Sequence, residues 1–226
     1  MPGDPFSGQI NPNQDPKTIA HLKQELGLND APWIQYCRWL GNVMHGDFGT
    51  SYIQHVAVTS LIWDRAVNTF WLSIVTVILS YYISIPLGII AGHHQDEWQD
   101  QSIQIFNYIT FAIPGFVSLI LGLWLFGFTL GWFPIAGSVS TECDSSVFAY
   151  IWSRFYHLIL PAMLCAILST TGTVQYLRTG IVDNKVEDYV RTARSKGVPE
   201  KVVFNKHILR NSLLPIAAFM GNTITG

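Results

Sequence analysis

The sequence predicts an all-α protein: a polytopic membrane helical bundle with short extracytoplasmic helices at its N-terminal side. Two observations predict this fold class. Only 12% of the 226 residues are charged, about half of the roughly 25% found in soluble domains. The chain also contains long runs without Asp, Glu, Lys or Arg, at 67–95, 101–141 and 155–177, the last with His157 as its only histidine.

Each of these runs is long enough to cross a membrane. The hydrocarbon core is about 30 Å thick and needs about 20 mostly apolar helical residues. We therefore predict spans at about 70–92, 103–128 and 158–177. The alternative, buried helices in a large soluble core, is disfavoured because such helices are seldom so long and so free of charge. Another span begins at Ser212, but the remaining residues reach only roughly 22 Å, so we expect the chain to be cut within this helix.

The distribution of positive charge sets the predicted orientation. The basic segment, 178–210, holds eight of the thirteen Lys and Arg residues, whereas 131–154 holds only Arg154. Short cytoplasmic loops collect Lys and Arg, so we place the basic segment in the cytoplasm and 1–64 outside. The chain then divides into an extracytoplasmic segment, 1–64, and a transmembrane domain, 65–226, in the plasma membrane. Because the first residues do not form a signal peptide, we expect an earlier helix to have carried 1–64 across.

The extracytoplasmic segment is expected to contain two short helices. The first follows Asp15 and Pro16 and stops at Gly27, and the second covers 31–44 with its large apolar residues mostly on one face. That face either packs on the outer ends of the spans, which we prefer, or rests on lipid. Cys37 and Cys143 would both lie outside and could pair, although their spacing does not argue for a disulfide.

The composition excludes several kinds of membrane chemistry. Apart from His157 at one end, the predicted spans carry no acid or base, which argues against an ion-coupled carrier and an intramembrane hydrolase. The chain has no P-loop sequence, and nothing in it calls for a cofactor, a metal ion or a nucleic-acid partner. A transporter of this kind must draw its energy from a partner protein. A membrane scaffold without transport activity is the alternative from a different class.

The most charged stretch is "DYVRTARSKGVPEKVVFNKHILRNSLLP", from Asp188 onward. A polar helix is expected over 186–196, Gly197 ends it, and Pro199 begins a second helical piece. The sequence therefore predicts a helix, a sharp turn and a helix in the cytoplasm, joined to a span at each end. Such an element would transmit the motion of a bound partner to the membrane helices.

This stretch resembles the cytoplasmic EAA loop of ABC-transporter permeases. The general form is E-A-A, three residues, Gly, nine residues and I-x-L-P; here 191–193 take the E-A-A positions and 207–210 the last four. Only Ala193, Gly197 and Leu209 match that form, but "DYVRTARSKG" and "HILRNSLLP" resemble the variant of the peptide and nickel branch. "PGDPFSG", "GDFGTSY" and "NTFWLSI" resemble the first permease subunit of that branch, as in oligopeptide permeases.

The resemblance implies a truncated ABC importer permease fold, with one further helix before residue 1 and two after Arg210. It implies a second homologous permease subunit, two ATP-binding subunits, an extracytoplasmic substrate-binding protein and a peptide as substrate. The chain itself would not be an enzyme, because ATP hydrolysis is expected in the partner subunits. Nickel or another small solute is the alternative substrate within the same family.

The resemblance also assigns residues to the contact with the ATP-binding subunit. Ala193 would be small so that its helix can enter a groove of that subunit, and Gly197 would supply the turn. The basic side chains could pair with acidic groups of the ATPase or with phospholipid headgroups. The residues expected at this contact are Asp188, Tyr189, Arg191, Thr192, Ala193, Gly197 and His207.

Overall fold

The computed structural model describes residues 30–51, 53–54, 56–139 and 146–225. The secondary-structure elements of these residues are helices, and one isolated β-bridge joins Thr50 to Ala57. The predicted all-α class is confirmed. The chain divides into two compact units, Met1–Thr69 and Phe70–Gly226. Each unit is described separately below.

In the first unit, helix α2 covers Pro32–Met44, which confirms the second predicted short helix. Pro32 begins it, where the missing N–H has no helical partner to lose. Asp30 ties down its first turns: its carboxylate pairs with Arg38 at 2.8 Å, and its carbonyl accepts from the Gln35 side chain at 2.7 Å. The helix expected at 17–26 and the partner proposed for Cys37 lie outside the described residues.

Two long helices form the frame of the bundle. Helix α3 covers Val58–His93 and begins in the first unit, and α6 covers Val147–Lys185. Each contains a stretch long and apolar enough to cross a membrane. Both extend beyond the predicted spans, 70–92 and 158–177. Charged residues such as Arg178 end a charge-free run but do not interrupt helical hydrogen bonding, so the helices continue past them.

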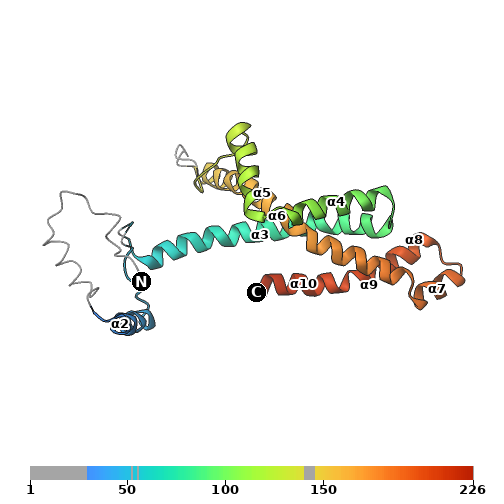
Figure 1. Cartoon of the computed structure of the whole chain (residues 1–226), viewed down its shortest axis with the longest axis horizontal. Helices are drawn as coiled ribbons and strands as arrows, with labels where there is room; N and C mark the ends of the chain where they lie inside the picture. The colour runs from blue at the N-terminus through green and yellow to red at the C-terminus, as the bar shows by residue number, and fades with distance from the viewer. Residues whose placement is uncertain (1–29, 52, 55, 140–145, 226) are drawn as a thin grey trace. The chain divides into compact units, whose positions relative to one another are not determined.

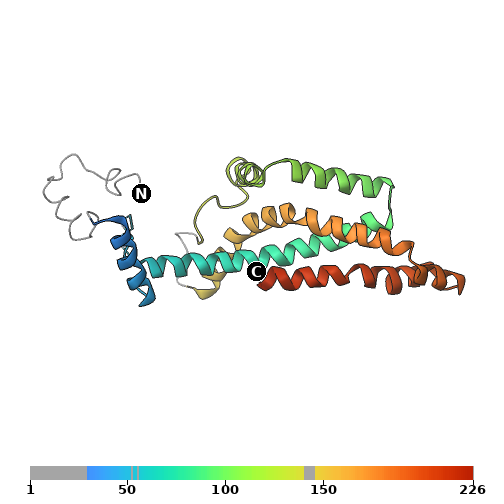
Figure 2. The same ribbon diagram turned by 60° about the horizontal axis from the view of Figure 1, so that its bottom comes forward.

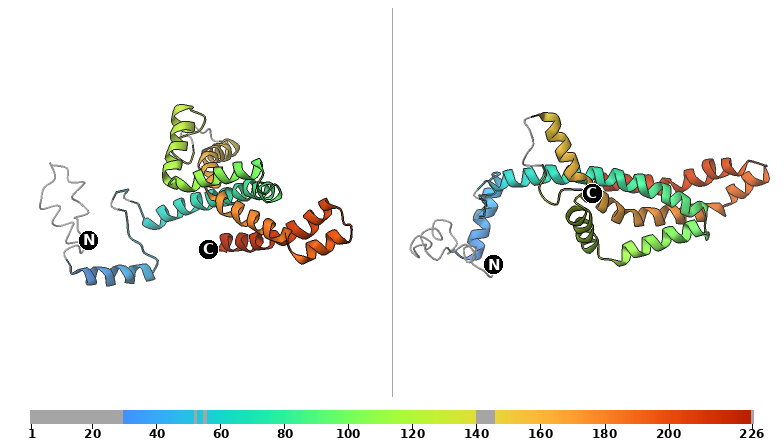
Figure 3. Two further views of the ribbon diagram at one scale, coloured as in Figure 1. Left: turned by 45° about the vertical axis from the view of Figure 1, so that its right-hand side comes forward. Right: turned by 90° about the horizontal axis from the view of Figure 1, so that it is seen from above.

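The predicted span over 103–128 is not continuous. Helix α4 covers Trp98–Ala112, α5 covers Gly115–Gly122, and the π-helix η1 follows at Leu123–Thr129. The axis bends by 99° between α4 and α5–η1, which Figure 3 shows as α5 turning away from α4. Pro114 lacks the N–H that would continue the ladder, and the residue before it, Ile113, is extended at φ −88° and ψ 125°. The single helix predicted over 103–128 is therefore replaced by two pieces.

After α6, the chain turns through α7 and returns along the bundle. Helix α7 covers Asp188–Ser195, followed by α8 (Glu200–Val202), the π-helix η2 (Val203–Leu209), α9 (Arg210–Ser212) and α10 (Leu214–Thr225). The last three elements form one nearly continuous helical run that lies beside α6 (Figures 1 and 2). Pro215 falls in the first turn of α10, where a proline is tolerated.

Small residues let α3 and α6 approach closely. A Cβ atom added at Gly88 would lie 2.9 Å from the Leu177 Cβ atom, and one added at Gly92 would lie 2.7 Å from the Ile181 Cβ atom. Two buried serines, Ser80 and Ser84, precede these glycines. Small residues at every fourth position are typical of helix contacts inside membranes, where close van der Waals packing replaces the hydrophobic driving force.

Helix α4 has the polarity expected of a lipid-facing helix. The side chains it buries are polar, Asp100 and Asn107, whereas its large apolar residues are exposed. A helix on the surface of a soluble protein shows the opposite arrangement. The exposed set, from 44% to 84% exposed, is Ile105, Phe106, Tyr108, Ile109 and Phe111.

The contact at Gly92 gives a direct test of the packing. We expect Gly92→Ala to lower the midpoint of thermal unfolding in detergent, because the added methyl meets Ile181 and overpacking costs about 1–3 kcal/mol. Gly172→Ala is the matched control: Gly172 lies inside α6 with nothing within 4 Å of an added Cβ atom, so better helix propensity should leave the midpoint equal or higher. Equal midpoints for the two variants would contradict this contact.

Candidate functional site

The basic segment turns back on itself at one end of the bundle. The part from α7 (Asp188–Ser195) through the turn to α8 (Glu200–Val202) is called the elbow below. Helix α6 continues to Lys185, so Arg178 and Lys185 belong to this helix rather than to a loop. Between α6 and α8 the chain forms α7 and a turn, and α7 packs on η2. The predicted arrangement of a helix, a sharp turn and a second helix is confirmed.

Gly197 makes the turn. Its φ angle is +72°, in the left-handed region that glycine adopts without steric cost. Its N–H donates to the Arg194 carbonyl at 3.0 Å, and the next N–H, of Val198, donates to the Ala193 carbonyl at 3.3 Å. This pair of bonds is the Schellman motif, which caps the last carbonyls of α7. Pro199 then prevents the helix from continuing in its first direction.

A clamp between Arg194 and Glu200 holds the turn closed. The guanidinium donates to both carboxylate oxygens, at 2.7 Å and 3.1 Å, and a third nitrogen reaches the Lys185 carbonyl at 3.4 Å. The hydrogen bonds from Arg194 lower the pKa of Glu200 below its ordinary value. Glu200 is therefore ionised at neutral pH, and its charge is matched within the elbow.

Helix α7 has one buried face and one exposed face. Val190 is fully buried and Ala193 is 7% exposed, and both pack in an apolar core with Val203, Ile208 and residues of α6. The opposite face exposes four of the predicted contact residues to solvent. These are Asp188, Tyr189, Arg191 and Thr192.

Asn184 joins α7 to the two helices beneath it. Its side-chain amide donates to the Gly180 carbonyl at 2.7 Å and to the Ser212 hydroxyl at 3.1 Å. Its oxygen accepts a hydrogen bond from the Tyr189 hydroxyl. One side chain of α6 therefore connects Tyr189 of α7 to Ser212 of α9, beside the apolar core that also joins these elements.

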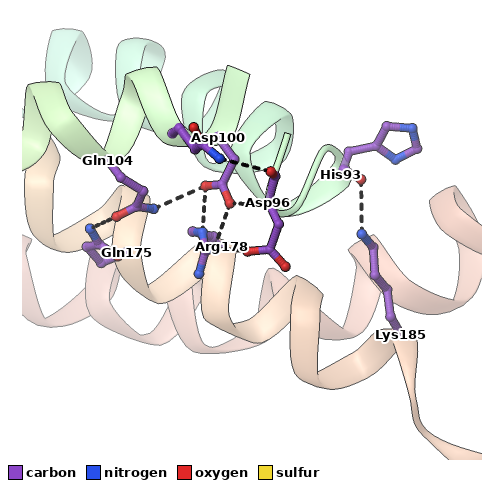
Figure 4. A network of polar contacts seen from close by, with 8 residues as sticks. His93, Asp96, Asp100, Gln104, Gln175, Arg178 and Lys185 are labelled. Carbon is purple, nitrogen blue, oxygen red and sulfur yellow. Dashed lines mark hydrogen bonds and ion pairs between the residues drawn. The ribbon is translucent and has the colours of Figure 1, made fainter. Parts of the chain in front are cut away.

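An ion pair joins α4 to α6 near the same end of the bundle (Figure 4). Arg178 donates to both carboxylate oxygens of Asp100, each at 2.6 Å. Asp100 is 1% exposed, and its carboxylate also accepts from the Asp96 N–H at 2.9 Å and from the Gln104 amide at 3.3 Å. Gln104 in turn accepts from Gln175 of α6. Polar pairs thus continue along the α4–α6 interface.

A second contact ties the end of α6 to the end of α3. The Lys185 ammonium donates to the His93 carbonyl at 3.0 Å (Figure 4). The His93 ring meets Phe204 of η2 edge to face, with ring centroids 4.4 Å apart. The ends of α3, α6 and η2 are therefore linked at the elbow.

The structure separates the predicted contact residues into two groups. Ala193 faces the interior of the chain, so its small size serves the packing of α7 on η2 and does not leave it available to another protein's groove. His207 is not part of α7 and lies half-buried in η2. The remaining predicted residues lie on that face or at the turn.

Sequence reasoning missed the polar residues of the α4–α6 interface. Arg178 was counted among the basic residues of the 178–210 segment, and Asp100 was given no role. A signal was present: Asp100, Gln104 and Asn107 follow the i, i+4, i+7 spacing that places them on one face of a helix. A polar face on an otherwise apolar helix predicts a buried polar contact with another helix.

Comparison with known proteins agrees with this architecture. Residues 84–226 match the model of the family described as binding-protein-dependent transport system inner membrane component. The chain belongs to this family. It is therefore a component of a membrane transport system, and the family places it in the inner membrane as a multi-pass protein.

Relatives named as permease proteins match nearly the whole chain. The oligopeptide transport system permease protein AppB of Bacillus subtilis is 37% identical over 97% of this chain and 69% of its own length. The glutathione transport system permease protein GsiC of Salmonella paratyphi A is 33% identical over 98% and 68%. A putative peptide permease protein of Brucella ovis is 33% identical over 99% and 70%. Family members of this type are permease subunits of ABC transporters for peptides.

The ion pair of α4 and α6 predicts a large effect of a single substitution. Arg178→Ala should destabilise the protein by about 3–5 kcal/mol, because it leaves a buried carboxylate without a countercharge. Thermal unfolding in detergent measures the effect, and the double variant Asp100→Asn, Arg178→Gln should recover most of it. Arg191→Ala is the control: its pair with Asp188 is 3.6 Å long and exposed, worth about 1 kcal/mol or less. Similar losses for both arginines would contradict the assignment.

Proposed function

We propose that this chain is the membrane-spanning permease subunit of an ATP-driven, binding-protein-dependent importer and forms part of the translocation path for oligopeptides. The relatives named for oligopeptide and peptide transport support the substrate. The family supports dependence on a binding protein. The chain lacks a P-loop sequence, so ATP is hydrolysed by partner subunits and not by this chain.

The observation that carries the coupling mechanism is the two-faced helix α7. Its apolar face is buried in the chain's own core, and its polar face is exposed at the position that the EAA segment occupies in the sequence. We place the contact with the ATP-binding subunit on that exposed face and at the turn. The proposed contact residues are Asp188, Tyr189, Arg191, Thr192 and Gly197.

The complete transporter, in this proposal, contains a second homologous permease subunit and two ATP-binding subunits. The ATP-binding subunits lie in the cytoplasm against the basic segment, and the substrate-binding protein docks on the extracytoplasmic side of the membrane. When ATP binding moves the ATPase, α7 moves with it, and the core, Asn184 and the Arg194–Glu200 clamp carry the movement to α6 and η2. The path between the two permease subunits then opens on the other side.

Crosslinking tests the proposed contact. In the assembled transporter with its native cysteines replaced by serine, we expect Thr192→Cys to crosslink to the ATP-binding subunit, because Thr192 is exposed on the outer face of α7. Val190→Cys, two residues away, is the control and should not crosslink, since Val190 is fully buried. Gel electrophoresis with a short bifunctional reagent separates the outcomes. The absence of a crosslink from Thr192 under ATP-bound and ATP-free conditions would exclude this face.

Uptake measurements test the substrate and the turn together. Cells with the complete transporter should accumulate a labelled oligopeptide, and excess unlabelled peptide should compete while nickel ions should not. Gly197→Val should reduce uptake at least about tenfold, because a β-branched residue is strained at a positive φ, whereas Gly197→Asn should retain most of it, since Asn tolerates this region. Uptake of nickel in place of peptide would support the alternative substrate. Unchanged uptake in Gly197→Val would contradict the coupling role.

A further inference from the structure

A cleft of about 450 Å³ lies between the end of α3 and the start of the returning helix, α8–η2. Its apolar lining residues, called the floor below, are Ile89, Ile90 and Phe204. Its polar lining residues, called the rim below, are His93, His94, Glu200, Lys201 and Asn205. A groove with an apolar floor and a polar rim fits an amphiphile that has an acyl chain and a polar head.

The cleft lies where α3 reaches the edge of the hydrocarbon core. The charge-free run of this helix ends at Gln95, and a span beginning at Phe70 crosses about 30 Å near residue 90. The floor residues therefore lie at the depth of acyl chains, and the rim lies at the depth of phospholipid headgroups. Ile90 is 41% exposed, so its side chain is open to a molecule in the surrounding membrane.

The charges at the rim favour an anion. Glu200 also lines the cleft, but both of its oxygens accept from Arg194, so its negative charge is matched within the elbow. Lys201 is exposed beside it. The His94 Nδ1 atom lies 3.1 Å from the Glu97 carboxylate, so the His93 ring and the His94 Nε2 atom are the ring groups that can add hydrogen bonds.

We propose that this cleft binds one anionic phospholipid, with an acyl chain along Ile89, Ile90 and Phe204 and the phosphate at Lys201 and the histidines. Basic pockets between membrane helices at the headgroup level are suited to anionic lipid heads. The bound lipid contacts both α3 and η2. It therefore stabilises the junction between a membrane-spanning helix and the segment that carries α7.

Native mass spectrometry of the assembled, delipidated transporter tests the site by titration with dioleoyl phosphatidylglycerol. We expect one lipid to be retained per copy of this chain at concentrations where dioleoyl phosphatidylcholine is not retained. Lys201→Glu, which reverses the rim charge, and Ile90→Trp, which fills the floor, should each weaken retention at least about tenfold. Both substitutions are at exposed positions. Lys206→Glu is the control, since it makes the same charge change outside the cleft and should leave retention unchanged.

Four outcomes would overturn the proposal. Equal retention of phosphatidylcholine would remove the role of the anionic head. Equal loss in Lys206→Glu and Lys201→Glu would indicate general charge attraction. Displacement of the lipid by glycerol 3-phosphate at similar concentrations would indicate a site for free phosphate compounds. Loss of the ATP-binding subunit in Lys201→Glu with lipid retention unchanged would identify the cleft as a protein-docking surface.

Discussion

The arrangement of the bundle depends on the ion pair between a buried carboxylate, that of Asp100, and the Arg178 guanidinium. Asp100 is 1% exposed, and an ionised group at such a position is stable only with a close countercharge and further hydrogen bonds. Arg178 supplies the charge, and the Asp96 N–H and Gln104 supply the remaining donors. Arg178 forms both hydrogen bonds to Asp100 only when the two residues lie directly opposite each other. This pair therefore fixes the position of α4 along α6.

The fixed end of α6 in turn positions the elbow. Two turns after Arg178, Asn184 and Lys185 contact α9 and the end of α3, so α7 starts from a rigid base. Its apolar face then closes the core formed with η2. The exposed face of α7 is consequently presented in one orientation, which is the requirement for passing a partner's movement to the membrane helices.

The sequence predicts the features that follow from local rules. Charge-free runs identify α3 and α6, and Gly197 with Pro199 identifies the turn, because helix length, left-handed φ and the missing proline N–H act within a few residues. A single span was predicted over 103–128 without the bend at Pro114, whose angle depends on how α5 packs on α6. The partner of Asp100 lies 78 positions away in the sequence, and the inward direction of Ala193 depends on η2. Both require the packed structure.

Different forces hold the parts of the bundle together, and this difference suits the proposed coupling of α7 to the membrane helices. Apolar surface gains little by leaving lipid, so α3 and α6 depend on close packing at Gly88 and Gly92, and α4 depends on its polar pairs. The core under α7 is different, because the charged elbow extends beyond the charge-free spans into water, where burying Val190 and Ala193 is favourable. The α7 contact is thus strong but non-directional. The Asp100–Arg178 pair, in contrast, is made of directional hydrogen bonds that join α4 to α6, so under the proposed coupling a movement of α7 would shift these two helices together.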